Sequence, residues 1–136
     1  MKRAVAISLK IPDNTAYTAL VALRRLDVPV ERIERCEIYF FNDDGNVEAL
    51  KQRIEADERI FNPNLHRLTV LDSHRPGRGE VWIEPLASSK DAPAATAWRL
   101  FDAQNRLVSH GVLAVAAERL LCNPAIDRAL TEARAG

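Results

Sequence analysis

The chain has 136 residues, of which 47% are hydrophobic and 28% charged, and its 19 Lys and Arg residues balance its 19 Asp and Glu residues. This length favours one domain with its own core, and the composition is typical of a globular protein. The balanced charge argues against nucleic acid or an anionic membrane surface as a partner.

The cysteines and the apolar runs narrow the class of protein further. Two cysteines are too few for a disulfide framework, and no Cys/His spacing indicates zinc. No run approaches the ~20 apolar residues of a membrane span, and the N-terminus shows no apolar signal segment. We therefore expect a cytoplasmic protein without metal, cofactor or membrane partner.

Alternation of apolar with small or polar residues from Ala4 to Ile11 predicts the first strand, with one buried face. The opposite face carries Ala4, Ala6, Ser8 and Lys10. Pro12 ends the strand, and Asp13 or Asn14 is expected to cap a helix that runs to about Leu26. The expected apolar stripe of this helix consists of Tyr17, Leu20, Val21, Leu23 and Leu26.

The next elements repeat this alternation of strand and helix. A second strand is predicted over Ile33–Phe41. A second helix begins at Val47 and is expected to end before Asn62-Pro63, and a third strand spans Leu65–Leu71. The order β-α-β-α-β over residues 1–72, with right-handed β-α-β crossovers, predicts an α+β fold of the ferredoxin-like sandwich kind.

The rest of the chain is expected to be a partial repeat or extension, residues 80–136, joined by a Gly/Arg linker at residues 73–79 and packed on the same sheet. Strands are predicted at Val81–Pro85 and Thr96–Phe101, and a helix at Ser109–Leu121. The segment Ile126–Ala133 is ambiguous. Correspondence with the first half argues for a strand there, whereas the Ala, Arg and Glu content favours the helix that we expect.

An Asn-Pro motif supports the internal repeat. The stretch Phe61–Arg67 is similar to Cys122–Arg128, sixty-one positions later. Asn, Pro, an aliphatic residue and Arg occupy equivalent positions in the two stretches. Proline disfavours helix at the residue before it, and Asn tolerates the left-handed turn at a helix end. The motif therefore predicts two helices that stop at Phe61/Asn62 and at Cys122/Asn123.

The apolar pattern also predicts a core. We expect twelve side chains to be buried on one common side of the sheet: Val5, Ile7, Leu9, Leu20, Leu23, Cys36, Ile38, Phe40, Leu50, Ile54, Leu68 and Val70. The strand face of Ala4, Ala6, Ser8 and Lys10 would then be left uncovered. We therefore expect a homo-oligomer in which a second copy covers it.

Few residues suggest catalysis. His66, His74 and His110 lack spaced partners, and Cys36 and Cys122 lie at apolar positions where cysteine acts as a small hydrophobe. The acidic pair Asp43-Asp44 is typical of a turn, and the pair Asp57-Glu58 is typical of a solvated helix end. No phosphate loop, dinucleotide fingerprint or nucleophile elbow is present. We predict no catalytic residues.

The linker is the stretch with binding character. Arg75 and Arg78 lie in a Gly-containing segment, where two guanidinium groups can hold a phosphate or carboxylate. The same segment also suits a plain solvated hinge between two halves. Arg75 and Arg78 are accordingly the predicted anion or partner contacts.

Four stretches of the first half are similar to a known family: Ala4–Lys10, Ala19–Leu26, Val30–Arg35 and Ile60–Arg67. In these stretches about half of the chain resembles the PurS subunit of phosphoribosylformylglycinamidine synthase. The resemblance implies a non-catalytic partner that dimerises through its sheet and bridges ligase and glutaminase subunits of a purine-biosynthesis enzyme. Shorter members end near the third strand, whereas this chain continues.

Two functions are therefore open. The first is an accessory subunit of this PurS-like kind. The second is a ferredoxin-like regulatory or ligand-binding module that takes an anionic small molecule through Arg75 and Arg78.

Overall fold

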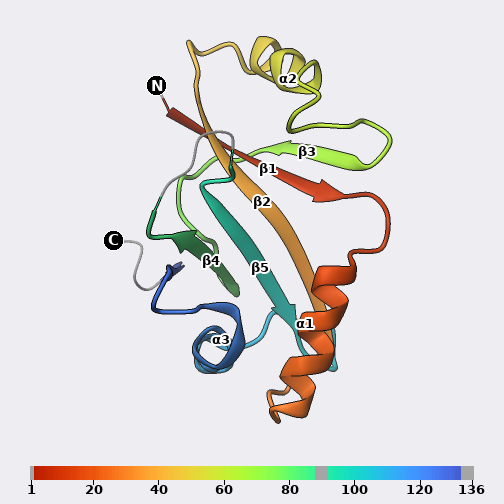
Figure 1. The fold of residues 1–136 in the computed structure, drawn as a ribbon, viewed down its shortest axis with the longest axis vertical. Helices are drawn as coiled ribbons and strands as arrows, with labels where there is room; N and C mark the ends of the chain where they lie inside the picture. Colours follow the sequence, from red (N-terminus) through yellow and green to blue (C-terminus); the bar gives the residue numbers. More distant parts are fainter. Residues whose placement is uncertain (1, 88–91, 133–136) are drawn as a thin grey trace.

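The computed structural model describes residues 2–87 and 92–132, and it shows a mixed α+β fold built on one six-stranded sheet in which every pairing is antiparallel (Figure 1). The strand order across the sheet is β3-β1-β2-β5-β4-β6. In chain order the elements are β1 (Lys2–Leu9), α1 (Asn14–Arg25), β2 (Arg32–Asn42), α2 (Val47–Glu55), β3 (His66–Val70), β4 (Glu80–Pro85), β5 (Ala95–Phe101), α3 (His110–Ala116), the π-helical segment η1 (Ala117–Leu121) and β6 (Asp127–Thr131).

The connection from β1 to β2 differs from the crossover that the sequence predicts. β1 and β2 are antiparallel neighbours, with Val5 opposite Tyr39, whereas a β-α-β crossover would make them parallel. The physical reason is that the chain re-enters the sheet at the end where β1 stops, since Ile7 pairs with Glu37 near the start of β2 and Lys2 with Asn42 at its end. Helix α1 carries the chain past the end of β1, so that β2 begins beyond it and returns alongside (Figure 1). The crossover prediction is therefore wrong for β1-α1-β2, whereas β2 and β3, which are both antiparallel to β1, run parallel to each other with α2 between them in the chain.

Each helix begins at a residue whose side chain caps it. Asp13 accepts a hydrogen bond from the Ala16 N–H at 3.1 Å, Asn46 from Ala49 at 3.0 Å and Ser109 from Val112 at 3.3 Å. Such caps satisfy backbone donors that have no partner in the first turn. Of the two predicted caps for α1, Asp13 is the one used.

The buried stripe of α1 also differs from the prediction. Its buried residues are Ala16, Ala19 and Leu23, whereas Tyr17 is 67% exposed and Leu26 38% exposed. The small side chains let the helix lie close to the sheet. Of the predicted stripe, Leu23 is fully buried and Leu20 packs against the same cluster, so the prediction is wrong for Tyr17 and Leu26.

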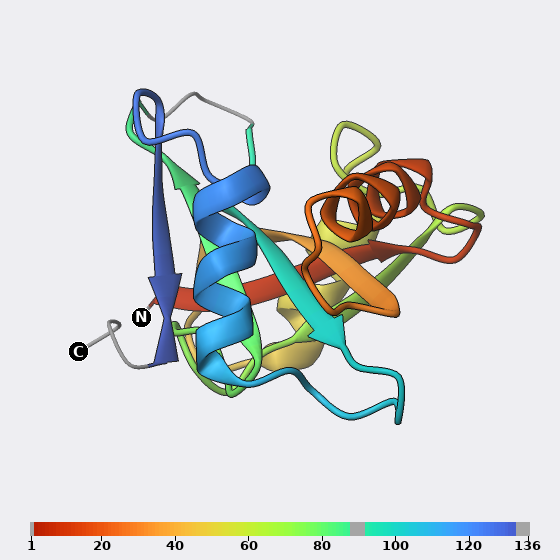
Figure 2. The same cartoon turned by 90° about the horizontal axis from the view of Figure 1, so that it is seen from below.

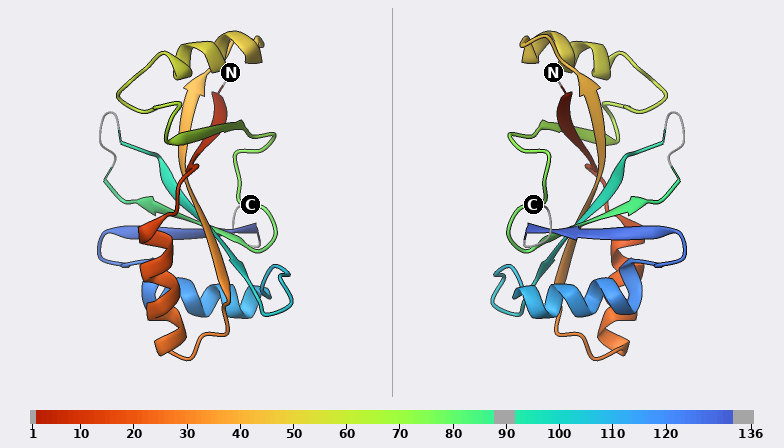
Figure 3. Two further views of the ribbon diagram at one scale, coloured as in Figure 1. Left: turned by 90° about the vertical axis from the view of Figure 1, so that its right-hand side faces the viewer. Right: turned by 90° about the vertical axis from the view of Figure 1, so that its left-hand side faces the viewer.

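All three helices lie on one face of the sheet, here called the helix face. Strand register places Val5, Tyr39 and Val81 on this face, and two apolar clusters form there. One cluster packs α2 on β1 and β3, and the other packs α1 and α3 on β4 and β5. Figure 3 shows α2 at one end of the twisted molecule and the other two helices at the opposite end. Figure 2 shows α1 and α3 from below. The segment η1, which continues α3, contacts α1, and its Arg119 donates to the Leu26 carbonyl at 2.9 Å.

The opposite face carries a third, smaller cluster, so the predicted common side for all core residues is wrong. Because Val5 pairs with Tyr39, the side chains of Cys36, Ile38 and Phe40 point away from the helices. Ile38 packs there with Trp82, which is 1% exposed, and with Ala6, Ala95 and Ala97. Ala4 and Ala6 are themselves buried by the chain. Half of the face that motivated the homo-oligomer is thus covered by the chain itself, while Ser8 is half-buried and Lys10 exposed, and the homo-oligomer stays a prediction.

The connection from β3 to β4 explains part of this burial. It starts at one edge of the sheet and ends next to the other edge strand, and the strands β1, β2 and β5 lie between. Leu71 donates to the Ala4 carbonyl at 2.9 Å, and the His74 ring meets the Phe40 ring edge-on at 5.9 Å on the opposite face. Pro76 is buried as well. The predicted linker therefore runs along the sheet with Pro76 and Gly79 buried, while the rest of residues 73–79 are exposed.

Two predicted segment ends need correction. Helix α2 ends at Glu55, well before Asn62, and Asp57 accepts backbone hydrogen bonds from Ile60 and Phe61 in the turn that follows. The C-terminal segment is the strand β6 rather than a helix; of the predicted range, Ala133 lies outside the described residues. β6 pairs with β4, so one edge of its backbone gains a ladder of hydrogen bonds, and this tertiary pairing outweighs a weak helix propensity.

The two Asn-Pro segments make the same hydrogen bonds. The Asn62 carbonyl accepts from Leu65 and His66, and the Asn123 carbonyl accepts from Ile126 and Asp127. Each motif then joins a strand: Lys10 donates to the Leu65 carbonyl at 2.8 Å, and Leu86 donates to the Ile126 carbonyl at 2.8 Å. β3 therefore lies on β1 as β6 lies on β4.

This correspondence extends to the whole sheet. Val5 pairs with Tyr39 in the first group of strands, and Val81 pairs with Trp98 in the second. The groups β3-β1-β2 and β6-β4-β5 meet where β2 pairs with β5, and an approximate two-fold axis passes through the paired residues Glu37 and Thr96. The division into residues 1–72, 73–79 and 80–136 stays a prediction, because all six strands share one continuous sheet.

Candidate functional site

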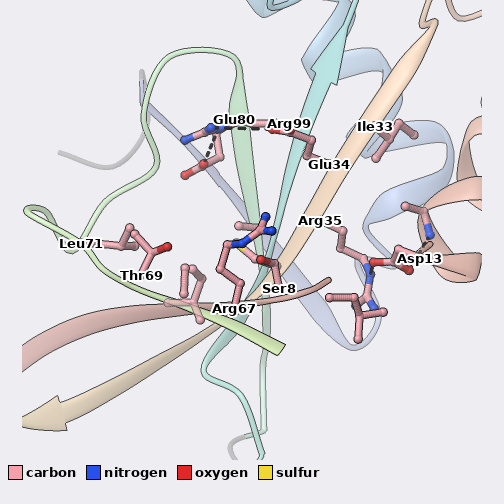
Figure 4. A pocket seen from close by; sticks show the side chains of 16 residues that line it. Ser8, Asp13, Ile33, Glu34, Arg35, Arg67, Thr69, Leu71, Glu80 and Arg99 are labelled. Carbon is pink, nitrogen blue, oxygen red and sulfur yellow. Dashed lines mark hydrogen bonds and ion pairs between the residues drawn. The ribbon is translucent and has the colours of Figure 1, made fainter. Parts of the chain in front are cut away.

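A cavity of about 420 Å³ opens where β1 and β2 separate (Figure 4). Their pairing ends at Ile7 and Glu37, beyond which β1 pairs only with β3, while β2 continues along β5. Side chains from five strands line the space between them, among them Ser8, Cys36, Arg67, Glu80 and Arg99. The divergence of the strands, rather than a loop, creates this candidate site.

One wall of the cavity is a charge network around Glu80. The Glu80 carboxylate accepts hydrogen bonds from the Trp82 indole N–H at 2.5 Å and from Arg99 Nε at 3.2 Å, and its side chain is 12% exposed. Arg99 also lies 3.8 Å from the carboxylate of Glu34, which Arg32 approaches to 2.9 Å. Glu34 and Glu80 are thus both neutralised by arginine.

A second ion pair closes the side of the cavity next to α1. Arg35 donates to Asp13 at 3.0 Å, and the two side chains are only 17% and 16% exposed. Asp13 also caps α1 with its other oxygen. The pair therefore fixes the start of the helix against β2 and leaves neither charge free for a ligand.

Arg67 differs from these arginines. It extends into the cavity from β3 beside Ser8, its partner in the strand register, and Thr69 follows on the same face (Figure 4). Within the described residues, the Arg67 guanidinium and the hydroxyls of Ser8 and Thr69 make no side-chain hydrogen bond and no ion pair. The cavity thus holds a cation without a counter-charge, flanked by two hydroxyl groups.

Cys36 also lines the cavity but is not activated. Burial, and secondarily the nearby Glu80 carboxylate, raise the pKa of its thiol to about 11. Burial likewise raises the pKa of Cys122. A nucleophilic cysteine needs a lowered pKa, so the environment of Cys36 opposes that role.

The three histidines are dispersed and do not meet at the cavity. The Nδ1 atom of His66 accepts from the Asn62 N–H at 2.9 Å, a contact that stabilises the Asn-Pro turn. His74 packs on Phe40, and His110 is the exposed first residue of α3. Their positions suit structural or solvated roles.

The predicted anion or partner contacts, Arg75 and Arg78, lie in the connection between β3 and β4. Both residues are exposed, and neither lines the cavity. The Arg75 N–H donates to the Ser73 hydroxyl at 3.1 Å. Their role as a binding pair stays a prediction.

The acidic pairs have the structural roles that turns require. Asp43 accepts from Arg3 at 2.8 Å and from the Gly45 N–H at 2.8 Å, and its side chain is 1% exposed. Asp57 accepts from the side chain of Arg59 at 2.9 Å. Within residues 2–87 and 92–132, no three His, Cys, Asp or Glu side chains lie close enough together to hold a metal ion.

Sequence reasoning missed the polar side of the cavity. Ser8 and Thr69 are ordinary strand residues, and Arg67 appears in the sequence only as the last residue of the Asn-Pro motif. The register that brings Ser8 opposite Arg67 is set by a pairing between distant segments. The recurring arginine of the motif was the one available signal.

Comparison of the sequence with known proteins does not assign the chain to a family. No protein-family model matches the chain, and no curated protein matches it closely enough to count as a relative. In the part of the chain that the structure describes, no helix is long and apolar enough to cross a membrane.

Proposed function

We propose that this chain is a non-catalytic accessory subunit of a PurS-like kind, which supports assembly of the glutamine-dependent ligase complex phosphoribosylformylglycinamidine synthase. The observation that carries the proposal is the pairing of β2 with β5 inside one chain. It joins two similar groups of three strands about an approximate two-fold axis. In the family that residues 1–72 resemble, two separate subunits make such a sheet by dimerising. We place this role in the cytoplasm.

A proposal about the fold accompanies the proposed function. We propose that the fold is a variant of the ferredoxin-like sandwich, supported by an antiparallel sheet with its helices gathered on one face. A self-associating chain remains part of the proposal. Sedimentation of the purified protein at micromolar concentration tests it, because a single species of 15.2 kDa would exclude self-association.

The edges of the sheet are the surfaces that we propose for partner subunits. Among the strands that the structure describes, β3 and β6 each pair with one strand only, so their outer backbone groups can bind another strand. Beside β6, Leu86 and Ile126 are both 60% exposed and are joined by a backbone hydrogen bond of 2.8 Å. This exposed apolar corner is our first candidate for contact with a partner.

Affinity capture from the native host, with identification by mass spectrometry, tests the proposal. We expect a ligase subunit and a glutaminase subunit to be captured together with the protein. The double variant Leu86→Asp/Ile126→Asp should lose them, and the matched surface variant Tyr17→Asp on α1 should keep them. Capture of neither subunit by the unmodified chain would rule the proposal out.

The second candidate is a regulatory module that takes an anionic small molecule through Arg75 and Arg78. The observation that favours it is the exposure of both side chains on a connection that is itself packed on the sheet. The variant Arg75→Gln/Arg78→Gln should then lose ligand binding and keep its partners. In an accessory subunit whose linker contacts a partner, the same variant would instead weaken capture.

A further inference from the structure

We propose that the cavity between β1 and β2 binds the phosphate or carboxylate group of a small molecule, with Arg67 as the cation and Ser8 and Thr69 as hydroxyl donors. Arg67 is the one arginine lining this cavity that has no acidic partner in the described residues, since Arg35 pairs with Asp13 and Arg99 with Glu80. A guanidinium group binds such anions through two parallel hydrogen bonds.

The second half of the chain supplies a comparison within the same molecule. The strand pair β4 and β6 corresponds to the pair β1 and β3. Glu84 lies opposite Arg128 in the second pair, at the positions that Ser8 and Arg67 occupy in the first. There the two side chains form an ion pair of 3.0 Å. An acidic partner was thus geometrically available for this arginine, and the first half carries a serine in its place.

The neighbouring position shows the same difference. Thr69, opposite Ala6, corresponds to Leu130, opposite Trp82, and Leu130 packs against the apolar cluster on the opposite face. The first half therefore carries Ser, Arg and Thr where the second half carries Glu, Arg and Leu. One set leaves a cation with two hydroxyls facing a cavity, and the other neutralises the cation and fills the space with an apolar side chain.

The other charges of the cavity do not oppose an anion at Arg67. Three acidic side chains line the cavity, namely Asp13, Glu34 and Glu80. The carboxylate of each lies within 4 Å of at least one arginine side chain. The volume of about 420 Å³ is sufficient for a small metabolite. The side of the site next to Ala97 and Ile38 is apolar, which suits a ligand with an anionic end and a less polar remainder.

Titration of the purified chain at fixed ionic strength tests the site without any partner protein, so its result is independent of the proposed assembly role. The probes are inorganic phosphate and acetate, followed by isothermal calorimetry and by the NMR signals of the arginine Nε–H groups. We expect saturable binding of at least one probe, with Arg67 as the arginine whose signal moves. The stronger probe distinguishes a phosphate site from a carboxylate site.

Three variants decide whether Arg67 is responsible. Arg67→Gln should weaken binding by about tenfold or more, because a charge-assisted pair of hydrogen bonds is lost. Ser8→Glu, which reproduces the ion pair of the second half, should abolish binding while thermal melting shows an intact fold. Arg128→Gln is the matched control and should bind like the unmodified chain.

The outcomes that overturn the proposal are equally defined. It is wrong if neither probe binds saturably, or if Arg67→Gln binds as tightly as the unmodified chain. Equal weakening by Arg128→Gln would also refute it, because it would indicate a general effect of net charge. Should Ser8→Glu fail to fold, the comparison of Arg67→Gln with Arg128→Gln still decides the question.

Discussion

The buried carboxylate of Asp43 shows how a single charged residue is accommodated in this fold. Hydrogen bonds from Arg3 and then from the Gly45 N–H hold the pKa of Asp43 below its ordinary value of 3.8. A group whose pKa is lowered on folding stabilises the folded state above its unfolded pKa, and that contribution is lost as the pH falls through the folded pKa.

We therefore predict that Asp43→Asn lowers the free energy of unfolding at pH 7, and that the difference from the unmodified chain shrinks as the pH falls below 3.8. Chemical denaturation at a series of pH values measures this. The control is Asp44→Asn, at the exposed neighbour whose carboxylate accepts the Asn46 N–H at 3.2 Å. A difference that stays constant between pH 7 and strong acid would contradict the assignment.

The thiol of Cys36 gives a second prediction at this scale. With a pKa of about 11 it is almost entirely protonated at pH 8.5, where an ordinary thiol is about half ionised. Alkylation by iodoacetamide at this pH should be much slower at Cys36 in the folded chain than in the chain unfolded by urea. Mass spectrometry of the modified peptide measures both rates. Equal rates in the two states would show that the thiol is neither buried nor electrostatically suppressed.

At the residue scale, the sequence predicted local chemistry better than distant pairing. The cap of α1 at Asp13 follows from a polar residue before an amphipathic run, and the structure has it. The cavity residue Arg67 could not be found in this way. Its surroundings depend on β3 lying beside β1 and on β1 leaving β2 after Ile7, and neither is encoded within a few residues of Arg67.

The helices of the two halves allow a prediction at the scale of elements. Asn46 caps α2 and Ser109 caps α3. Replacing either residue by Ala should lower the free energy of unfolding by about 0.5–2 kcal/mol, because a backbone donor of the first turn loses its partner. Thermal or urea unfolding of Asn46→Ala and Ser109→Ala measures the losses. Asn46→Asp and Ser109→Thr keep an acceptor and should lose less; losses as large as those of the alanine variants would mean that the caps are not responsible.

Elements were predictable where their own pattern was strong. The strands over β1, β2 and β5 follow from alternation, and their observed limits differ from the predicted ones by a few residues. β6 was predicted as a helix because Ala, Arg and Glu dominate a short segment, while its strand conformation is imposed by pairing with β4. The end of α2 was missed because the Asp57 turn stops the helix before the Asn-Pro motif is reached.

At the scale of the whole molecule, the sheet carries apolar clusters on both faces, and these should unfold together. Leu23 on the helix face is 0% exposed, and Ile38 on the opposite face is 1% exposed. Leu23→Ala and Ile38→Ala should each cost about 2–5 kcal/mol, since each leaves a cavity in a packed cluster. Each should also shift one cooperative transition.

Urea denaturation followed by fluorescence and by circular dichroism measures both effects. Tyr17→Ala is the control, because Tyr17 is 67% exposed and its truncation should change the free energy of unfolding by at most about 0.5 kcal/mol. If the Ile38 variant were as stable as this control, the second cluster would contribute little. Separate transitions for the two variants would indicate two independent units.

The α+β class of the molecule was predictable from the alternation of strands and helices, but its sheet was not. Period-two patterns show which residues of a strand share a face, and they do not show which face of the next strand matches. The sequence therefore grouped Ile38 with Val5, whereas the register places Tyr39 beside Val5. The antiparallel joining of β1 to β2 has the same origin, since it depends on where β2 begins relative to β1.

Reconstitution of the proposed enzyme is the most direct test of the central claim. Purified ligase and glutaminase subunits from the same host are assayed for glutamine-dependent formation of the amidine product, with and without this chain. We predict that adding the chain brings the two subunits together in sedimentation and raises the glutamine-dependent rate, while the chain alone has no activity. Subunits that assemble and react equally well without the chain would contradict the proposed accessory role.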